Sequence, residues 1–295
     1  MQKAFHGAIT ALVTPFTNGI FDEKRYRALI DTQIAAGIHG LVPCGSTGES
    51  ATLTHAEHEE VIRVCVDQVN KRVPVLAGAG SNNTTEAIAL TKIAKDAGAD
   101  GALLITPYYN KPTQEGLYQH YASVAKAVDL PLILYNVPGR TGCNMLPPVL
   151  ARLAKDFPTI IGVKEATGNL AQGSEVIEQC PKDFLVLSGD DFTALPLMCI
   201  GGVGVISVTS NICPKEMAAM CNAFESGDLA KAVALHHKLF ALHKAMFIET
   251  NPVPVKKALA FMGQIESGVR LPLCEMTEQH CHDLRAVLKN YDLIA

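Results

Sequence analysis

The sequence lacks an excess of basic residues. It holds 25 Lys and Arg against 29 Asp and Glu, a formal net charge of −4 with histidine neutral. A protein that binds nucleic-acid phosphates typically shows a basic excess, so we expect no nucleic-acid partner. Of the 295 residues, 48% are hydrophobic and 18% charged, which provides material for a core and excludes a disordered chain.

No segment has the pattern of a signal peptide or a membrane span. The opening MQKAFHGAIT lacks the apolar run of about 7–15 residues that a signal peptide needs. Residues 192–208 are the best membrane candidate, but Pro196 and the Gly201-Gly202 pair leave it short of about 18 clean apolar residues. We therefore expect a cytoplasmic protein without a membrane partner.

The cysteines lack the spacing of a disulfide framework or a metal site. There are 9 of them, an odd number without a CxxC pair, as expected for reduced cytosolic thiols. The tightest cluster is His280-Cys281-His282, and adjacent residues on a helix point in different directions. We expect no metal site.

The glycine fingerprints GxGxxG and GxxxxGK[ST] are also absent, which disfavours the rival fold, a doubly wound nucleotide-binding sheet. Eight short β-type runs recur instead, each followed by an amphipathic stretch of helical length. They begin near Ala8, Gly40, Val73, Gly101, Leu130, Thr159, Phe184 and Val203. Eight such βα units in about 225 residues predict an α/β fold, a (β/α)8 TIM barrel.

The strand pattern stops after Pro214. Four helices are predicted beyond it, over residues 215–224, 230–247, 254–262 and 277–289. The first completes the barrel and the others form an appendix. We expect a catalytic barrel over residues 1–224 and a C-terminal helical subdomain over 225–295 packed on it, since no Ser-, Gly- or Pro-rich linker separates them.

Lys164 ends the sixth β-type run. Alternation along a strand places Ile160, Gly162 and Lys164 on one face, which, if inward, puts the lysine at the barrel mouth with room left by the glycine. A lysine in such a low-dielectric place is costly unless its pKa falls, and a neutral amine can attack a ketone to form a Schiff base. The alternative is a lysine that pairs with Glu165.

Two neighbouring runs end in further candidates. Tyr135 closes the fifth run, where a phenol could shuttle protons to a Schiff-base lysine one strand away. Arg140 follows in a Gly-Arg-Thr-Gly turn, and its planar fork suits a carboxylate. A core-capping tyrosine and a solvated loop arginine remain the alternatives.

Two more strand ends carry hydroxyl groups. Ser46 and Thr47 lie in a glycine-flanked turn whose hydroxyls and free backbone N–H groups could hold a small carboxylate, although an ordinary turn fits equally well. Tyr108 and Tyr109 lie on a loop between prolines and indicate an interface more than a core.

Four strand ends thus carry GSTGES, TPYYNKP, YNVPGRTG and GVKEATG, in that order. With these motifs the sequence resembles the dihydrodipicolinate synthase family of pyruvate-dependent class I aldolases, from Gly7 to about Leu288, including NPVPVKKAL at 251–259. The resemblance implies that pyruvate condenses with Lys164 to an imine, becomes an enamine and attacks L-aspartate 4-semialdehyde, a step toward diaminopimelate and lysine.

The resemblance also implies residue roles. The catalytic set would be Lys164, Tyr135, Ser46 and Tyr109, with Tyr109 reaching in from a neighbouring subunit. The substrate-binding set would be Thr47, Arg140, Gly189 and Ile206. The family needs no metal or organic cofactor, and its members suggest a homotetramer built as a dimer of dimers.

A third set matches the family's site for inhibition by lysine. It comprises Ser50, Ala51, His55, His58, Asn82, Glu86 and Tyr108. His55 and His58 are three apart on a predicted helix that Thr54 and Glu57 open as a capping box, so both can share one face. Solvated histidines and a surface glutamate are the alternative.

One departure keeps a second activity open. The family usually has Thr-Thr where this chain has Ser46-Thr47, and sialic-acid lyases of the same superfamily often have Gly-Ser-Thr-Gly-Glu. An N-acetylneuraminate lyase-like or 2-keto-3-deoxy sugar-acid aldolase would use the same lysine, but Arg140 favours the synthase. A zinc aldolase would need histidine ligands at strand ends, where none occurs, and a silent metabolite-binding barrel would not need the retained lysine, tyrosines and arginine.

Overall fold

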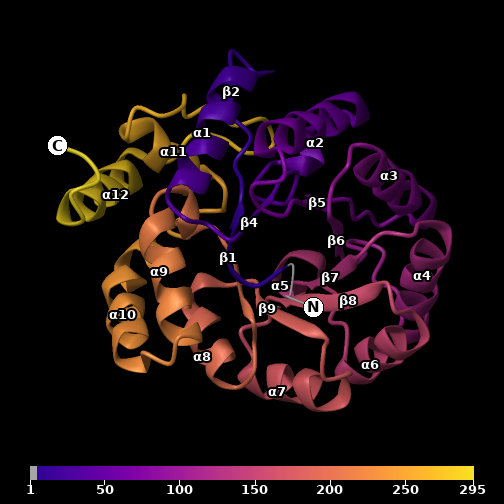
Figure 1. The fold of residues 1–295 in the computed structure, drawn as a ribbon. Helices are drawn as coiled ribbons and strands as arrows, with labels where there is room; N and C mark the ends of the chain where they lie inside the picture. The colour runs from indigo at the N-terminus through magenta and orange to yellow at the C-terminus, as the bar shows by residue number, and fades with distance from the viewer. Residues whose placement is uncertain (1–4) are drawn as a thin grey trace.

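The computed structural model describes residues 5–295 and shows a ring of parallel strands surrounded by helices (Figure 1). The strands are β1 (Gly7–Ala11), β4 (Gly40–Val42), β5 (Leu76–Gly78), β6 (Gly101–Ile105), β7 (Leu132–Asn136), β8 (Ile160–Glu165), β9 (Leu185–Ser188) and β10 (Gly204–Ser207). Their order is β4-β1-β10-β9-β8-β7-β6-β5, and a bridge between Leu41 and Val75 joins the ends. The predicted TIM barrel is confirmed. The first four residues of the chain lie outside the described part.

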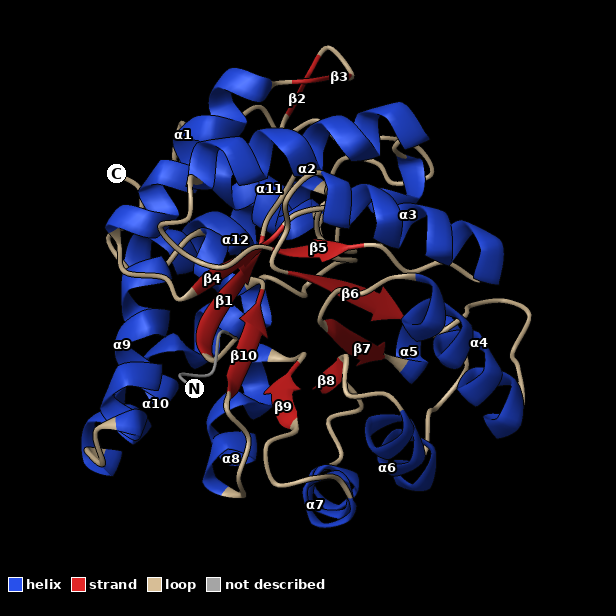
Figure 2. Ribbon diagram, turned by 45° about the vertical axis from the view of Figure 1, so that its right-hand side comes forward, coloured by secondary structure: helices blue, strands red, loops and turns tan. Residues whose placement is uncertain are grey.

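Helices alternate with these strands and cover the outside of the ring (Figure 2). They are α1 (Glu23–Ala35), α2 (His55–Val69), α3 (Thr84–Asp96), α4 (Gln114–Ala127), α5 (Pro138–Thr141), α6 (Pro147–Asp156), α7 (Leu170–Gln179), α8 (Ala194–Cys199) and α9 (Pro214–Glu225). Helices α10 (Leu229–Ala245), α11 (Val253–Phe261) and α12 (Glu278–Asn290) follow. All four helices predicted beyond Pro214 are present.

A small hairpin was not predicted. Strands β2 (Phe16–Thr17) and β3 (Ile20–Phe21) pair antiparallel across Asn18 and Gly19, whose φ angles are 52° and 76°. Positive φ at both central residues is what a tight two-residue hairpin turn requires, and Asn-Gly adopts it readily. Two-residue strands are too short to show an alternating pattern in sequence.

Buried apolar residues form two separate layers. The larger lies between the strands and the helices, and includes Leu41, Leu104 and Val163. The smaller fills the barrel interior and includes Ile9 and Leu187. Because the barrel interior is packed, a ligand can enter only above it, at the carboxyl ends of the strands.

A β-bulge in β8 corrects one prediction. Leu132 of β7 pairs with Ile160, but the next residue, Ile133, pairs with Gly162, so Ile161 is an extra residue in β8. Alternation therefore breaks there: Ile160 packs in the outer layer, while Ile161 packs against the interior cluster. Ile160 does not share a face with Lys164, as the uninterrupted alternation predicted.

A buried ion pair joins the C-terminal segment to the second strand end. Lys256 of α11 lies 2.6 Å from Glu49 of the GSTGES motif, and neither side chain is exposed. The second carboxylate oxygen of Glu49 accepts the backbone N–H of Arg270. The segment beyond the barrel thus packs on the mouth of the barrel.

The helices of residues 5–295 include none with the length and apolarity needed to cross a membrane.

Candidate active site

A cavity of about 240 Å3 opens at the carboxyl ends of the strands. Six of the predicted catalytic and substrate-binding residues line it: Ser46, Thr47, Tyr135, Arg140, Lys164 and Gly189. They come from four different strand ends. The barrel therefore brings together residues that are up to 143 positions apart in the sequence, from 189 − 46.

Lys164 lies at the base of this cavity and is 7% exposed. Its Nζ lies 4.1 Å from the centre of the Tyr135 ring. Burial lowers the pKa of Lys164 to about 7; Asp191 partly opposes this effect and the positive charge of Arg140 adds to it. A large fraction of the amine is consequently uncharged near neutral pH, as a nucleophile requires.

Glu165 does not pair with Lys164. Its carboxylate accepts bonds from the backbone N–H of Thr167 at 2.7 Å and from the side chains of Asn136 and Gln172 at 3.2 and 3.3 Å. These partners lie on the helix side of β8, away from the barrel interior. Within residues 5–295 the lysine has no ion pair, so the structure does not support the alternative of a paired strand-end lysine.

The space expected beneath Lys164 at Gly162 has another use. A Cβ added at Gly162 would lie 2.6 Å from the backbone oxygen of Leu185. The glycine therefore permits β9 to approach β8 closely, and it does not provide room for the lysine. Gly189 does provide that room, because a Cβ there would lie 3.0 Å from Lys164 Cε and 2.5 Å from Ala166 Cβ.

Tyr135 lies beside the lysine by strand register, since β7 and β8 pair Tyr135 with Lys164. Burial raises the pKa of Tyr135, while the positive charge of Arg140 and a hydrogen bond with Ser46 lower it. Ser46, Tyr135 and Lys164 thus line one cavity, with the phenol ring beside the amine.

The Ser46-Thr47 turn presents unpaired donors. Gly48 N–H and Glu49 N–H close the turn on the carbonyls of Gly45 and Ser46, at 3.0 and 3.2 Å. No described residue accepts a hydrogen bond from the backbone N–H of Ser46 or Thr47. Two free amides beside a buried hydroxyl form a site for a small anion.

Arg140 and Thr47 are both held by Asn251 of the C-terminal segment. The Asn251 amide donates to Thr47 Oγ1 at 3.0 Å, and its backbone carbonyl accepts from Arg140 Nη2 at 3.2 Å. Asn251 also lines the cavity, and its side-chain oxygen is buried without a partner among the described residues. Sequence reasoning missed this residue, although it begins the NPVPVKKAL segment.

Two predicted residues do not line this cavity. Ile206 is 1% exposed and packs in the interior cluster below it. Tyr109 is 90% exposed, and its φ of 72° is unusual for a residue with a side chain. An aromatic side chain this exposed is open to contact by another protein surface.

A second cavity of about 470 Å3 lies beside the first. Six of the seven predicted inhibitor-site residues line it: Ser50, Ala51, His55, His58, Glu86 and Tyr108. The seventh, Asn82, donates its amide to the Tyr108 carbonyl at 3.1 Å. Ser46, Arg140 and Asn251 line both cavities, so the two share a wall.

The histidines of the second cavity differ in state. The predicted capping box of Thr54 and Glu57 is present and starts α2. His58 is buried, which lowers its pKa to about 4, and Nδ1 has no partner in the described structure. His55 is exposed and lies 2.8 Å from Glu86. Hydrogen bonds from Ser81 and then His55 lower the pKa of Glu86.

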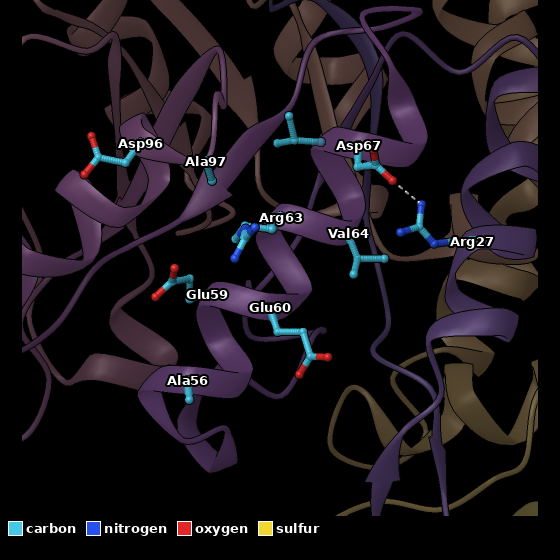
Figure 3. Close-up of a pocket in the computed structure, with 10 residues that line it drawn as sticks. Arg27, Ala56, Glu59, Glu60, Arg63, Val64, Asp67, Asp96 and Ala97 are labelled. Carbon is cyan, nitrogen blue, oxygen red and sulfur yellow. Dashed lines mark hydrogen bonds and ion pairs between the residues drawn. The ribbon is translucent and has the colours of Figure 1, made fainter.

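A larger hollow of about 930 Å3 lies on the outside of the barrel, between α1, α2 and α3 (Figure 3). Arg27 and Asp67 on its rim already pair with each other at 2.6 Å. None of the predicted residues lines it. Within residues 5–295 there is no group of three or more His, Cys, Asp or Glu side chains arranged to hold a metal ion.

The chain matches the family model described as the dihydrodipicolinate synthetase family over residues 4–291. It is 63% identical to the 4-hydroxy-tetrahydrodipicolinate synthase of Nitratidesulfovibrio vulgaris over 284 residues, which cover 96% of this chain and 97% of the relative.

Solved structures agree with the sequence comparison. The chloride-inhibited dihydrodipicolinate synthase of Acinetobacter baumannii, complexed with pyruvate, is 49% identical, with a TM-score of 0.96 over 98% of this chain and 99% of the other. The enzyme of Cyanidioschyzon merolae with lysine bound is 40% identical, with a TM-score of 0.96 over 99% of this chain and 100% of the other.

Proposed function

The chain belongs to the dihydrodipicolinate synthetase family, and from that membership we propose that Lys164, Tyr135 and Ser46 form its catalytic centre. It is a lyase of lysine biosynthesis with 4-hydroxy-tetrahydrodipicolinate synthase activity, which condenses pyruvate with L-aspartate 4-semialdehyde. The observation that carries the assignment of the centre is the buried amine of Lys164, whose pKa burial lowers to about 7.

The uncharged amine attacks the ketone of pyruvate. The resulting carbinolamine takes up a proton and loses water, which leaves a cationic iminium on Lys164. Loss of a methyl proton gives an enamine, whose carbon attacks the aldehyde, and the new alkoxide takes a proton. The amino group of the second substrate then adds to the iminium carbon and displaces the lysine as the ring closes. The phenol of Tyr135 and the hydroxyl of Ser46 move these protons.

The free amides of the Ser46-Thr47 turn would hold the pyruvate carboxylate. Their N–H groups are unpaired within the described structure, and Asn251 fixes the Thr47 side chain at 3.0 Å. The hydroxyl retained at Ser46 keeps the relay intact where most of the family has threonine. Gly189 keeps the wall open beside the lysine, and Ile206 supports the floor from below.

Arg140 would bind the carboxylate of the semialdehyde. Its guanidinium is anchored on one side by the Asn251 carbonyl and faces the same cavity as Lys164. A charged fork selects an aldehyde that carries a carboxylate over a neutral sugar aldehyde. The competing lyase activity is tested by comparing turnover with aspartate semialdehyde and with N-acetylmannosamine, each with pyruvate. Turnover with N-acetylmannosamine but not with aspartate semialdehyde would show that Arg140 does not select a carboxylate-bearing aldehyde.

The second cavity would bind lysine as an inhibitor. His58 lines this cavity, and its buried Nδ1 has no partner among the described residues, so the ring offers a polar contact for a ligand. Glu86, already ionised by its contacts with Ser81 and His55, offers a negative charge. A relative was solved with lysine bound. Ser50, Ala51, Asn82 and Tyr108 complete the proposed inhibitor site.

We also propose a homotetramer, a dimer of dimers, in which Tyr109 enters the active site of a partner. Tyr108 and Tyr109 are 39% and 90% exposed on one loop. Further apolar side chains are exposed on or beside α7, α8 and α10, which contact one another through α8: Leu170, Ile200 and Phe240, at 37–41% exposure. Two such groups of exposed side chains on one subunit support two kinds of interface.

The remaining proposals concern compartment and organisation. All 9 cysteines are free thiols, which supports a reducing compartment such as the cytoplasm. We propose residues 1–224 as the catalytic barrel and 225–295 as a helical subdomain that packs on it. Asn251 and Lys256 support the packing of the two segments, because both reach the strand ends from the second segment.

A further inference from the structure

A carboxylate is buried just behind the wall of the catalytic cavity. Asp191 is 1% exposed, and its neighbours Asp190 and Phe192 both line the cavity. Its Oδ2 accepts from the backbone N–H groups of Val208 and Thr209, each at 3.0 Å, and from Thr209 Oγ1 at 3.1 Å. Val208 lines the same cavity. The carboxylate of Asp191 thus lies directly behind residues that line the cavity where pyruvate would react.

The hydrogen bonds continue from this carboxylate into α10. Thr209 Oγ1 lies 2.9 Å from Nδ1 of His243, which is completely buried. Since the hydroxyl proton is donated to Asp191, Nδ1 of His243 must donate to the hydroxyl oxygen. Burial lowers the pKa of His243, so the ring is a neutral donor at the end of a directed chain. Its Nε2 has no partner among the described residues.

Tying two loops together does not require a charge. An asparagine oxygen could accept the same two backbone N–H groups, and it would avoid the cost of a buried anion. The second carboxylate oxygen, Oδ1 of Asp191, is buried without a partner in the described structure. A buried anion with an unused oxygen indicates that its charge has a role beyond joining the loops.

The chain path brings the segment of Asp191 close to Lys164. A Cβ at Gly189, two residues before Asp191, would lie 3.0 Å from Lys164 Cε. The charge of Asp191 raises the pKa of Lys164 against burial and Arg140. The other polar groups that face the amine line the cavity wall: Tyr135, Ser46, Arg140 and Asp190. Cys221 faces Asp191 from α9, and burial raises the pKa of its thiol to about 12, so it stays uncharged.

We propose that Asp191 is a positioning residue whose fixed negative charge stabilises the cationic iminium on Lys164, with Thr209 and His243 holding that charge in place. The inference rests on the proposed Schiff-base function of Lys164. Iminium formation turns a neutral amine, a ketone and one proton into a cation on Lys164 and water. A buried anion favours that cation over the neutral amine, and it does so without touching the substrate.

The test compares Asp191→Asn with Glu165→Gln. Each change removes one buried carboxylate, but Glu165 faces the helix side of β8. The initial rate of borohydride trapping of pyruvate is measured against pH at fixed sub-saturating pyruvate, by intact mass. We expect Asp191→Asn to lower the midpoint of the rate profile by at least about half a pH unit and to lower the plateau rate about threefold or more. Glu165→Gln should keep the wild-type midpoint.

Coincident profiles for wild type and folded Asp191→Asn would overturn the inference, while absence of trapping in the wild type would overturn the Schiff-base function itself. If Asp191→Asn does not fold, Asp191→Ala leaves space for a one-carbon molecule. Formate should then restore the wild-type midpoint, and neutral formamide of similar size should not. Restoration by both would show that Asp191 only joins the loops.

Discussion

At the scale of single residues, the position of a side chain on its strand determines its chemistry. Lys164 and Glu165 are adjacent in β8, yet Lys164 is buried at the mouth of the barrel and Glu165 lies among three hydrogen-bond donors on the other face. Burial lowers the pKa of the lysine to about 7. The glutamate is occupied by its own hydrogen-bond donors and does not pair with the lysine. A free amine at neutral pH therefore follows from strand alternation and an unpaired, desolvated site.

Arg140 provides a residue-scale prediction about the second substrate. Arg140→Ala should raise the KM for aspartate semialdehyde at least about tenfold, because a charge-assisted contact to a carboxylate is lost. Arg140→Lys should recover only part of it, since an ammonium lacks the planar fork. Steady-state kinetics with each substrate varied measures both effects.

Pyruvate imine formation by the same variants is the control and should remain detectable. A semialdehyde KM that is unchanged in Arg140→Ala would show that this arginine does not bind the substrate carboxylate.

At the scale of elements, contacts from the C-terminal segment hold the second strand end. Glu49 has a left-handed backbone with φ of 53° and a buried ion pair with Lys256 at 2.6 Å. Arg270 donates its backbone N–H to Glu49, and its side chain pairs with Glu57. The cationic groups of Lys256 and Arg270 each lie 4.2 Å from the centre of the Phe16 ring. The Ser46-Thr47 turn and the start of α2 are thereby fixed together.

Breaking this ion pair should destabilise the protein strongly. Lys256→Met leaves the Glu49 carboxylate buried without its cation and should lower the free energy of unfolding by about 3–5 kcal/mol. The double variant Glu49→Gln, Lys256→Met should lose less than Lys256→Met alone, because no uncompensated charge remains. Urea unfolding monitored by circular dichroism tests this. A loss below about 1 kcal/mol in Lys256→Met would refute the argument.

The sequence was sufficient for the order of the elements and for most strand-end residues. Regular βα spacing predicts the barrel, and the barrel forces Ser46, Tyr135 and Lys164 to one rim. The bulge at Ile161 was not predictable, because it arises from the pairing of β8 with β7 and leaves no local pattern.

Contacts between distant segments were missed for a similar reason. Asn251 meets Thr47, and Lys256 meets Glu49, across more than 200 residues, as the separations of 204 and 207 show. Neither pair has a periodicity or a short motif that links its members. The role of Gly162 was also misread, because only the packed structure shows that Leu185 takes the space beside it.

At the scale of the whole molecule, two cavities share one wall. Ser46, Arg140 and Asn251 line both the catalytic cavity and the second cavity, so a ligand in the second cavity would lie against residues that also line the cavity of Lys164. Coupling between two sites requires distinct ligands and a shared element whose arrangement both can change. Ser46, Arg140 and Asn251 are the residues through which we expect a ligand in one cavity to affect the other.

Lysine should inhibit through the second cavity. Glu86→Gln removes a charge beside His55 and should weaken inhibition at least about tenfold, with uninhibited turnover largely intact. Glu59→Gln, on the outer groove of α2, is the matched control and should leave inhibition unchanged. Initial rates with millimolar-range lysine should show partial or mixed inhibition with respect to pyruvate. Strict competition with pyruvate would place lysine in the catalytic cavity instead.

Tyr109 should act in the active site of another subunit. Tyr109→Phe should lower kcat by on the order of 10²-fold, because a proton-transfer hydroxyl is lost while volume is nearly kept. Tyr108→Phe is the neighbouring control and should retain most uninhibited turnover. Subunits of Tyr109→Phe mixed with subunits of Lys164→Ala should regain activity, since one site per mixed pair has both groups. If proven subunit exchange restores nothing, Tyr109 does not complete a partner's site.

The most direct test of the account is the identity and pH dependence of the pyruvate adduct. Borohydride added with pyruvate should attach one reduced pyruvyl group per chain, and peptide mass spectrometry should find it on Lys164. The initial rate of labelling should rise about tenfold per pH unit below a midpoint near 7, the value to which burial lowers the lysine pKa, and then level off, because only the uncharged amine attacks. Lys164→Ala should take up no label. An adduct on another lysine, or an initial rate that rises only near pH 10, would contradict the account.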